Sequence, residues 1–505
     1  MDHLEKHFQF FRKNIIGNEQ LIDTHYGEKK IHYADWAASG RLYMPIEEKI
    51  LYQFGPYVAN THTETNVTGK SMTWAYREAK NIIKKHVHAN ENDILLFEGS
   101  GMTGAIRKIQ RLLGLTLHEK YKKLNELKDW AKPVVFITHM EHHSNQISWE
   151  ETLADVVIVP PDDSGDVSPI MLEKMIKQYE DRPLKIGSFT ACSNVTGIVT
   201  PYHQLAEVMH KYNGICFIDF SASAPYIKMD MHPKNELQHL DGIFFSPHKF
   251  LGGPGTMGVA IVSQKILQTE TPDRPGGGTV NWTTPWGEKS YISNMEERED
   301  GGTPGFLQAI RTALAIGLKE EMGTENIVAQ DKNLIQLLFT QLKQNKKIIL
   351  LDQHKYERLP IISFYVEGIH HQLIVKLLND VHGIQVRGGC SCAGTYGHYL
   401  LNIDRQHSKS ITNEIDKGHY FTKPGWVRLS LHPTMTESDV TFISTAISDV
   451  VFNVNHYKKD YEYLPECNDY QHGNECNIDY GSWFDLSEKG YVQNGSKKGS
   501  VPIGV

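Results

Sequence analysis

One stretch of the chain places a lysine where it can react with a carbonyl group. Residues 242–245 are an apolar run, and Ser-Pro-His-Lys and a glycine-rich segment follow it. This pattern predicts a buried strand that ends just before Lys249. A desolvated lysine has a lowered pKa and can form a Schiff base with an aldehyde. Ser246 and His248 add hydroxyl and imidazole donors that suit a phosphate. Pyridoxal phosphate carries both groups and is the cofactor that this combination indicates, whereas a lysine in a surface turn is the alternative.

A carboxylate upstream favours the cofactor interpretation. Residues 215–218 form another apolar run, and Asp219 follows it directly. Pyridoxal phosphate needs an acidic partner at its pyridinium nitrogen in order to act as an electron sink. An aspartate at this point can also be a helix cap or a turn residue. However, only a short crossover and a second strand separate Asp219 from Lys249, so the sequence places both at strand ends.

A glycine-rich turn supplies a candidate phosphate site. Residues 93–97 are predicted to be a strand, and Glu-Gly-Ser-Gly-Met-Thr-Gly then leads into a helix. Such a turn presents free backbone N–H groups and the positive end of a helix dipole to an anion. We expect Gly101, Met102 and Thr103 to bind the cofactor phosphate, although many glycine-rich turns are only turns.

The elements that must position these residues alternate between strand and helix. Further strands are predicted at 134–138, 156–159 and 184–190. This alternation predicts an α/β fold with a mostly parallel sheet, in which ligands gather at the carboxyl ends of the strands. From about residue 324 the pattern changes to a smaller α+β unit, with strands at 361–366, 384–386 and 426–431 and helices at 371–378 and 437–452.

We therefore expect four parts of the chain. Residues 1–30, a helix and then a loop, pack with the small domain. Residues 31–320 form the large cofactor-binding domain and residues 321–455 the small C-terminal domain. Residues 456–505 are rich in Tyr, Asn and Gly and form a tail of uncertain order.

The composition is that of an ordinary soluble enzyme, with 505 residues, 40% hydrophobic and 22% charged. A net charge of -8 and the absence of a basic run argue against a nucleic-acid partner. No apolar stretch suggests a signal peptide or a membrane span. Six cysteines in such a chain do not make a disulfide framework, so a cytoplasmic location is expected.

From about residue 33 to about residue 451 the chain resembles the class V aminotransferase group of fold type I pyridoxal-phosphate enzymes. Within that group it is similar to the cysteine desulfurase and selenocysteine lyase branch. The resemblance implies a large domain with a mostly parallel seven-stranded sheet flanked by helices, and a smaller α+β C-terminal domain. The motifs that carry it are Ser-x-His-Lys at 246–249, Asp219, Glu-His at 141–142, Ser-Asn-x-x-Gly at 193–197 and Gly-Thr-Pro at 302–304.

The resemblance also implies roles around the cofactor. His142 would stack on the pyridine ring, and Asn194 would bind the ring hydroxyl near the substrate carboxylate. Ala38 would lie beside the substrate. Thr303 would reach the phosphate of the neighbouring subunit, which implies a homodimer. A purely structural histidine pair at 142–143 is the alternative, and no metal site is expected because no third ligand stands at suitable spacing.

The same resemblance implies a substrate and a reaction. Arg428 would grip the carboxylate of an amino acid, with Arg387 beside it. The thiolate of Cys392 would attack the sulfur of L-cysteine, or the selenium of selenocysteine, and alanine would be released. A sulfur-acceptor protein would then take the persulfide sulfur. In the alternative view, Cys390 and Cys392 are a buried structural pair or a metal clip.

Three departures from the family pattern leave the substrate open. Ala222 stands where the family often has Gln, the loop has cysteine at both 390 and 392, and His432-Pro433 replaces the usual Tyr-Asn. An aminotransferase, an epimerase or a carbon–sulfur lyase acting on another amino acid is therefore the alternative function. A non-catalytic scaffold would have no need of Lys249 and Asp219.

Overall fold

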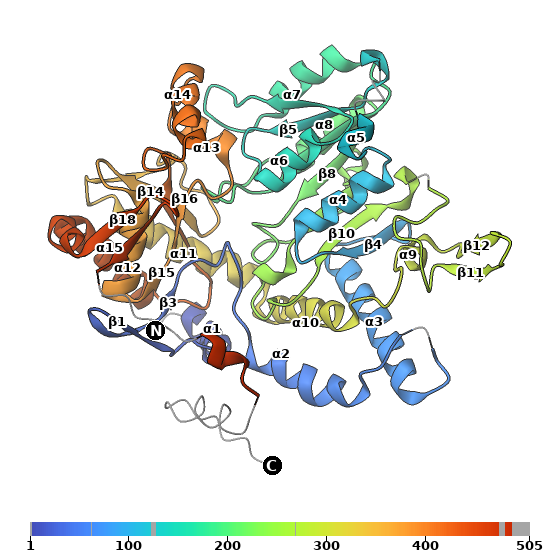
Figure 1. Ribbon diagram of the computed structural model, residues 1–505, viewed down its shortest axis with the longest axis horizontal. Coiled ribbons are helices and arrows are strands. Elements are labelled where there is room, and N and C mark those ends of the chain that lie inside the picture. Colours follow the sequence, from blue (N-terminus) through green and yellow to red (C-terminus); the bar gives the residue numbers. More distant parts are fainter. Residues whose placement is uncertain (1–2, 62, 123–127, 268, 474–479, 487–505) are drawn as a thin grey trace.

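A computed structural model describes residues 3–61, 63–122, 128–267, 269–473 and 480–486. Figure 1 shows a large α/β body, coloured mainly blue to yellow, beside a smaller body in orange and red that follows it in the chain. None of the described helices is long and apolar enough to cross a membrane.

A seven-stranded sheet forms the centre of the large body, in the order β4-β10-β9-β8-β7-β5-β6. Parallel ladders join β6, β5, β7, β8 and β9, whereas β10 runs antiparallel to both β9 and β4. The expected mostly parallel seven-stranded sheet is therefore confirmed. The strands are β4 (Asp93–Glu98), β5 (Val134–Thr138), β6 (Asp155–Val159), β7 (Lys185–Thr190), β8 (Ile215–Asp219), β9 (Gly242–Phe245) and β10 (Gly258–Ser263).

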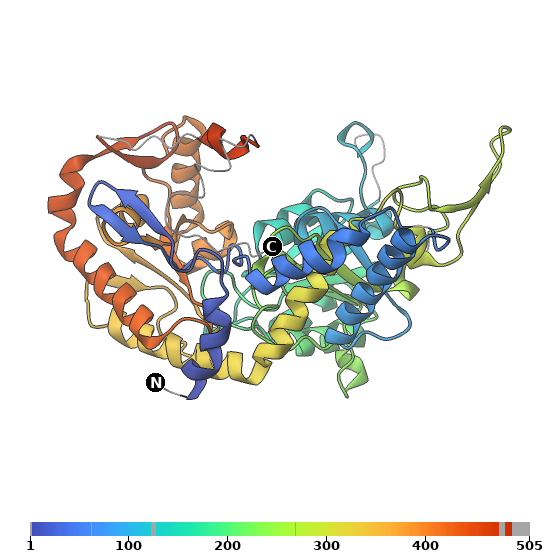
Figure 2. The ribbon, with the colours of Figure 1, turned by 90° about the horizontal axis from the view of Figure 1, so that it is seen from below.

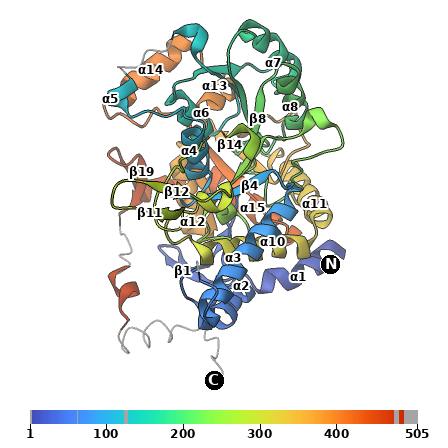
Figure 3. The same cartoon turned by 90° about the vertical axis from the view of Figure 1, so that its right-hand side faces the viewer.

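Helices cover this sheet because the interiors of its strands are mostly apolar and must be buried on both faces. Helix α4 packs on β10 and β4, α8 packs on β7 and β8, and α3 and α10 run side by side (Figures 1 and 3). The helices of this part are α2 (Met44–Glu48), α3 (Val67–His86), α4 (Met102–Leu112), α5 (Glu119–Lys122), α6 (His143–Glu150), α7 (Pro169–Ile176), α8 (Tyr202–Lys211), α9 (Met295–Arg298) and α10 (Phe306–Met322). A hairpin of β11 (Val280–Thr283) and β12 (Lys289–Tyr291) projects from this body (Figure 2).

The smaller body has its own antiparallel sheet, in the order β13-β14-β17-β16. The strand expected at 384–386 is the short strand β15, which pairs with β3 (His32–Tyr33) and not with this sheet. The next strand, β16, begins at Arg387 and pairs with β17. The elements of this body are α11 (Thr324–Leu342), β13 (Ile348–Leu350), β14 (Ile361–Val366), α12 (His371–His382), β15 (Ile384–Gln385), β16 (Arg387–Gly389), α13 (Gly394–Leu400), α14 (Arg405–Asp416), β17 (Trp426–Ser430) and α15 (Glu437–Tyr457).

The N-terminal segment lies against the smaller body. Helix α1 (His3–Lys13) is tied to it by an ion pair of 2.5 Å between Arg12 and Asp439. A hairpin, β1 (Leu21–Thr24) and β2 (Gly27–Lys30), replaces the loop expected before residue 30, and it turns at Gly27 with φ of 87°.

Part of the segment expected to be a tail is also folded. Strands β18 (Tyr461–Leu464) and β19 (Asp469–His472) form a hairpin. The Tyr461 hydroxyl donates to Asp380 at 2.8 Å, and the ring of His472 stacks on His25 at 3.8 Å. The rest of the tail expectation falls largely on residues 474–479 and 487–505, outside the described residues.

Candidate active site

The carboxyl ends of the central strands border a cavity of about 450 Å³, and the smaller body closes its other side. Most residues predicted from the sequence meet there, but Thr303 does not belong to the lining formed by the described residues. The predicted residues that line the cavity are Ala38, Gly101, Met102, Thr103, His142, Asn194, Asp219, Ser246, His248, Lys249, Arg387, Cys392 and Arg428.

Lys249 ends the short 3-10 turn Pro247–Lys249 that follows β9. The segment around Ala38 packs tightly on this turn, since Gly40 N donates to His248 O at 2.8 Å. A Cβ at Gly40 would lie only 1.9 Å from Phe250 O, so this contact requires glycine. Burial lowers the pKa of Lys249 to about 8, which leaves part of the amine neutral near neutral pH.

Asp219 ends the neighbouring strand β8 and is also buried. Its Oδ1 accepts a hydrogen bond of 2.8 Å from Ser221 N, which fixes the orientation of the carboxyl group. Burial raises the pKa of Asp219, whereas the hydrogen bond and the charge of Lys249 oppose this shift. In its ionised form this carboxyl would stabilise a cationic group beside it, such as the protonated ring nitrogen of pyridoxal phosphate.

The phosphate end of the site lies at the N-terminus of α4. Met102 N donates to Ser246 Oγ at 2.9 Å, which joins this helix to the turn after β9. A Cβ at Gly101 would lie 3.2 Å from Ser246 Oγ and 3.5 Å from His248 Nε2. Glycine thus keeps open a space surrounded by hydrogen-bond donors, and this cradle fits a phosphate. Burial lowers the pKa of His248 to about 4, so its ring is neutral at neutral pH.

His142 stands at the cavity wall as the N-cap of α6. Its Nδ1 accepts a hydrogen bond of 3.1 Å from Ser144 N, so the proton of the neutral ring is on Nε2. Burial, followed by the charge of Lys249, lowers the pKa of His142 to about 3. The site therefore presents a neutral imidazole, which is suited to lie against an aromatic ring without adding charge.

Arg428 of β17 carries a nearly buried guanidinium, and the residue is 2% exposed. It donates to Asp35 Oδ1 at 2.7 Å and to Asn194 O at 3.3 Å. Its Nε is buried and has no hydrogen-bond partner among the described residues. A buried donor without a partner costs free energy, so a substrate carboxylate in the cavity would supply what this group lacks.

The loop with Cys390 and Cys392 is fixed to the large domain. His143 N donates to Cys392 O at 2.8 Å, and Gly394 N donates back to His143 Nε2 at 2.9 Å. Asn194 Nδ2 also donates to Ser391 O at 2.7 Å, so one of its two amide hydrogens is already bonded to the loop. These contacts hold the thiol of Cys392 at the cavity, and Cys390 is not part of the lining formed by the described residues.

The backbone of this loop is unusual. Cys392 has φ of 57° and Ser391 has φ of 51°, a region that side chains other than glycine rarely adopt. Such a conformation persists only where the surroundings enforce it. The hydrogen bonds to the large domain provide that constraint, so the loop is held in one arrangement.

Sequence reasoning missed several supporting residues. Asp35 pairs with Arg428, His143 holds the cysteine loop and Ser221 orients Asp219. Glu141 is fully buried and accepts from Thr190 N at 2.9 Å, which joins the ends of β5 and β7, and burial raises its pKa to about 7. Glu141 lies in the Glu-His motif, and Asp35, His143 and Ser221 lie within three residues of Ala38, His142 and Asp219, so this proximity was the signal that could have found them.

The sheet, the lysine turn and the second domain define the fold of the pyridoxal-phosphate enzymes of fold type I. A profile of the family described as "Aminotransferase class-V" matches residues 32–443. The chain belongs to this family, whose members depend on pyridoxal phosphate.

Relatives within the family are named cysteine desulfurases. A probable cysteine desulfurase of Halalkalibacterium halodurans is 27% identical, and the match covers 74% of this chain and 86% of that protein. A cysteine desulfurase of Synechococcus elongatus is also 27% identical over 74% of this chain, but only 56% of that longer protein is covered. A solved structure of the cysteine desulfurase of Thermococcus onnurineus matches 88% of this chain and 98% of its own, with a TM-score of 0.68 and 21% identity, which shows the shared fold.

Proposed function

We propose that this protein is a pyridoxal-phosphate-dependent cysteine desulfurase that takes the sulfur of L-cysteine onto Cys392 and releases alanine. The observation that carries the proposal is that Cys392 lines the same cavity as Lys249 and Arg428, while belonging to a loop anchored on the large domain. The names of the relatives support the same reaction.

The residues present would hold the cofactor at five points. Lys249 would bind its aldehyde, Asp219 its ring nitrogen and His142 the face of its ring. Its phosphate would enter the cradle of Gly101, with Ser246, His248, Met102 N and Thr103 around it. Asn194 would contribute its remaining amide hydrogen near the ring hydroxyl. When bound there, the cofactor supplies an electron sink for the carbon that loses its proton.

The protein's own groups would then act on the substrate in sequence. Arg428, with Arg387 beside it, holds the carboxylate and so directs the thiol of the substrate toward Cys392. Lys249 removes the proton from Cα as a general base, for which a pKa of about 8 is well placed. Ala38 lines the cavity and would lie beside the substrate.

The transfer itself is a displacement at sulfur. The thiolate of Cys392 attacks the sulfur of the substrate, a new S–S bond forms and the carbon–sulfur bond breaks. The electron pair of that bond remains with the carbon fragment, which gains a proton and leaves as alanine. Selenocysteine would react by analogous chemistry, and an acceptor protein would remove the sulfur from Cys392.

A homodimer is part of the proposal. Thr303 lies on the surface, outside the cavity lining of its own chain, and its hydroxyl meets Asn60 Oδ1 at 3.4 Å. This position agrees with a role at the phosphate of a second subunit. A monomer in sedimentation that retains full cofactor occupancy would contradict it. We also place the protein in the reducing cytoplasm, since the described cysteines are all free thiols.

The proposed function is tested by incubating the purified protein with L-cysteine, selenocysteine and a panel of other amino acids. We expect alanine and sulfide from cysteine, with no keto acid. Borohydride reduction followed by peptide mapping should mark Lys249. Keto acid as the main product, or turnover of another amino acid that survives Cys392→Ala, would instead identify an aminotransferase or a different lyase.

A further inference from the structure

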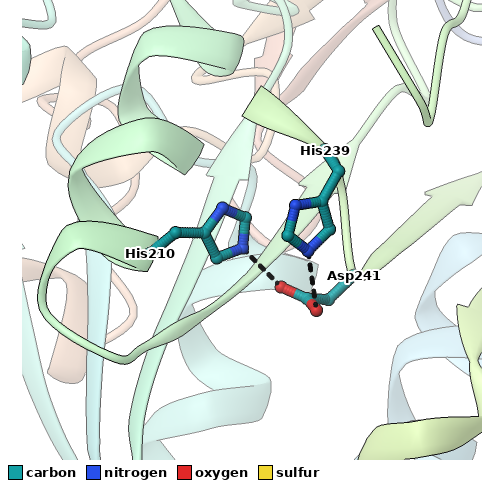
Figure 4. Close-up of side chains that lie close together, drawn as sticks. All are labelled: His210, His239 and Asp241. Carbon is teal, nitrogen blue, oxygen red and sulfur yellow. Dashed lines mark hydrogen bonds and ion pairs between the residues drawn. The ribbon is translucent and has the colours of Figure 1, made fainter. Parts of the chain in front are cut away.

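Away from the active site, two histidines and an aspartate form a compact cluster (Figure 4). His210 lies near the end of α8, and His239 and Asp241 lie on the segment that leads into β9. Their ligand atoms are all within 4.8 Å of one another. Asp241 precedes β9 and Lys249 follows it, so the cluster and the active site lie at opposite ends of the same strand.

The Nε2 atom of each ring faces the carboxylate of Asp241. His210 Nε2 lies 2.9 Å from Asp241 Oδ2, and His239 Nε2 lies 3.5 Å from Oδ1. The other nitrogen of each ring meets a backbone carbonyl, because His210 Nδ1 is 2.7 Å from Leu237 O and His239 Nδ1 is 2.6 Å from Glu236 O. The two rings are stacked, with centroids 3.9 Å apart and planes within 1°.

These contacts favour one tautomer in each ring. A carbonyl oxygen only accepts hydrogen bonds, so Nδ1 carries a hydrogen in both rings. A neutral ring of this kind has a lone pair on Nε2, and here that lone pair would face an anionic oxygen. A cation placed between the two Nε2 atoms and the carboxylate of Asp241 would be attracted by all three groups.

We propose that His210, His239 and Asp241 bind a divalent transition-metal ion of the Zn²⁺ class, with solvent completing the coordination. Two imidazoles and a carboxylate suit such ions, and the backbone carbonyls at Nδ1 are the outer partners that metal-binding histidines usually have. Ligand atoms about 2.1 Å from a tetrahedral Zn²⁺ lie roughly 3.4 Å from one another. The two nitrogen–oxygen distances, 2.9 and 3.5 Å, lie on either side of that value.

Binding requires one of the two rings to leave the stack. A metal lies in the plane of each imidazole that binds it, so the parallel rings must tilt toward a common point. His239 can make this movement because its side chain is 38% exposed, whereas that of His210 is 8% exposed. The same exposure lets solvent reach the remaining coordination position.

The position of the cluster assigns the ion a structural role. Asp241 Oδ2 also accepts a hydrogen bond of 2.8 Å from Cys216 N in β8. The metal would therefore connect α8 and the segment before β9 to the amino end of the sheet. None of these side chains lines the catalytic cavity. The ion should stabilise the fold without entering the chemistry.

The test is calorimetric titration of the chelator-treated, cofactor-loaded protein with ZnCl₂. We expect one ion per chain in the wild type, and binding weakened by about 100-fold or more in His239→Ala, since loss of even an outer partner costs 10- to 100-fold. His203→Ala is the matched control, because His203 lies on the same helix and contacts the same segment through Gln238 O at 2.9 Å. It should bind like the wild type.

Thiols are the competing ligands, so Cys392→Ser is titrated in parallel. The proposal requires that this variant keep the tight site and that His239→Ala lose it. Zn²⁺ should also raise the melting temperature of the wild type and of Cys392→Ser, but not that of His239→Ala. Absence of a stoichiometric site, equal affinity in His239→Ala, or loss of the site in Cys392→Ser would each overturn the assignment.

Discussion

Replacing Arg428 with alanine tests how the substrate is held. Arg428 is 2% exposed, and its guanidinium already donates to Asp35 and Asn194 O, while its Nε has no partner among the described residues. A substrate carboxylate would complete this set through charge-assisted hydrogen bonds. Losing such a buried pair costs on the order of 2–5 kcal/mol, part of it from the carboxylate left unpaired.

That cost predicts a fall in kcat/KM for L-cysteine of roughly 30- to several-thousand-fold. The assay follows alanine formation over a range of cysteine concentrations. Cysteamine, which lacks the carboxylate, provides an internal reference. The wild type should strongly prefer cysteine to cysteamine, and Arg428→Ala should lose most of that preference.

A second effect must be separated from substrate binding. Arg428→Ala leaves Asp35 without its ion pair, and this alone could disturb the cavity. The double variant with Asp35→Asn removes the unpaired charge. If substrate binding is the cause, the double variant should stay nearly as inactive as the single one. A change below about threefold in Arg428→Ala, or full recovery in the double variant, would refute the role of this arginine.

Three further predictions concern other parts of the site. The rate at which pyridoxal phosphate attaches to the apoprotein should rise with pH and level off above about 8, because only neutral Lys249 reacts. In Asp219→Asn the midpoint should move to lower pH, since the carboxylate raises that pKa, and a rate independent of pH between 6 and 9 would contradict the assignment. In a single turnover, mass spectrometry should find one added sulfur on the loop peptide of Cys390→Ser and none on that of Cys392→Ser. Desulfuration by the latter would end the desulfurase proposal. His143→Ala removes the acceptor of Gly394 N and should slow persulfide formation by about 5- to 10-fold, as expected for one hydrogen bond of roughly 1 kcal/mol, with cofactor binding unchanged.

The sequence by itself determined the main frame of this protein. A continuous apolar run that ends in polar residues or glycine predicts a buried strand without any knowledge of distant residues. Residues 242–245 and 215–218 could therefore be predicted to be strands. Because parallel strands deliver their carboxyl ends to one edge, Lys249 and Asp219 could be brought together without a structure. The projecting hairpin and the hairpin at 461–472 had no such signal.

Only the tertiary structure decided how distant residues meet. The pairing of Asp35 with Arg428 and the anchoring of the cysteine loop on His143 join segments far apart in the chain. Their hydrogen-bond directions depend on how the two domains pack, which no local pattern contains. The cluster of His210, His239 and Asp241 is likewise assembled from a helix end and a loop, and its character follows from which ring nitrogen meets a carbonyl. Residue types set the available chemistry, whereas packing decides which groups face one another and with which protons.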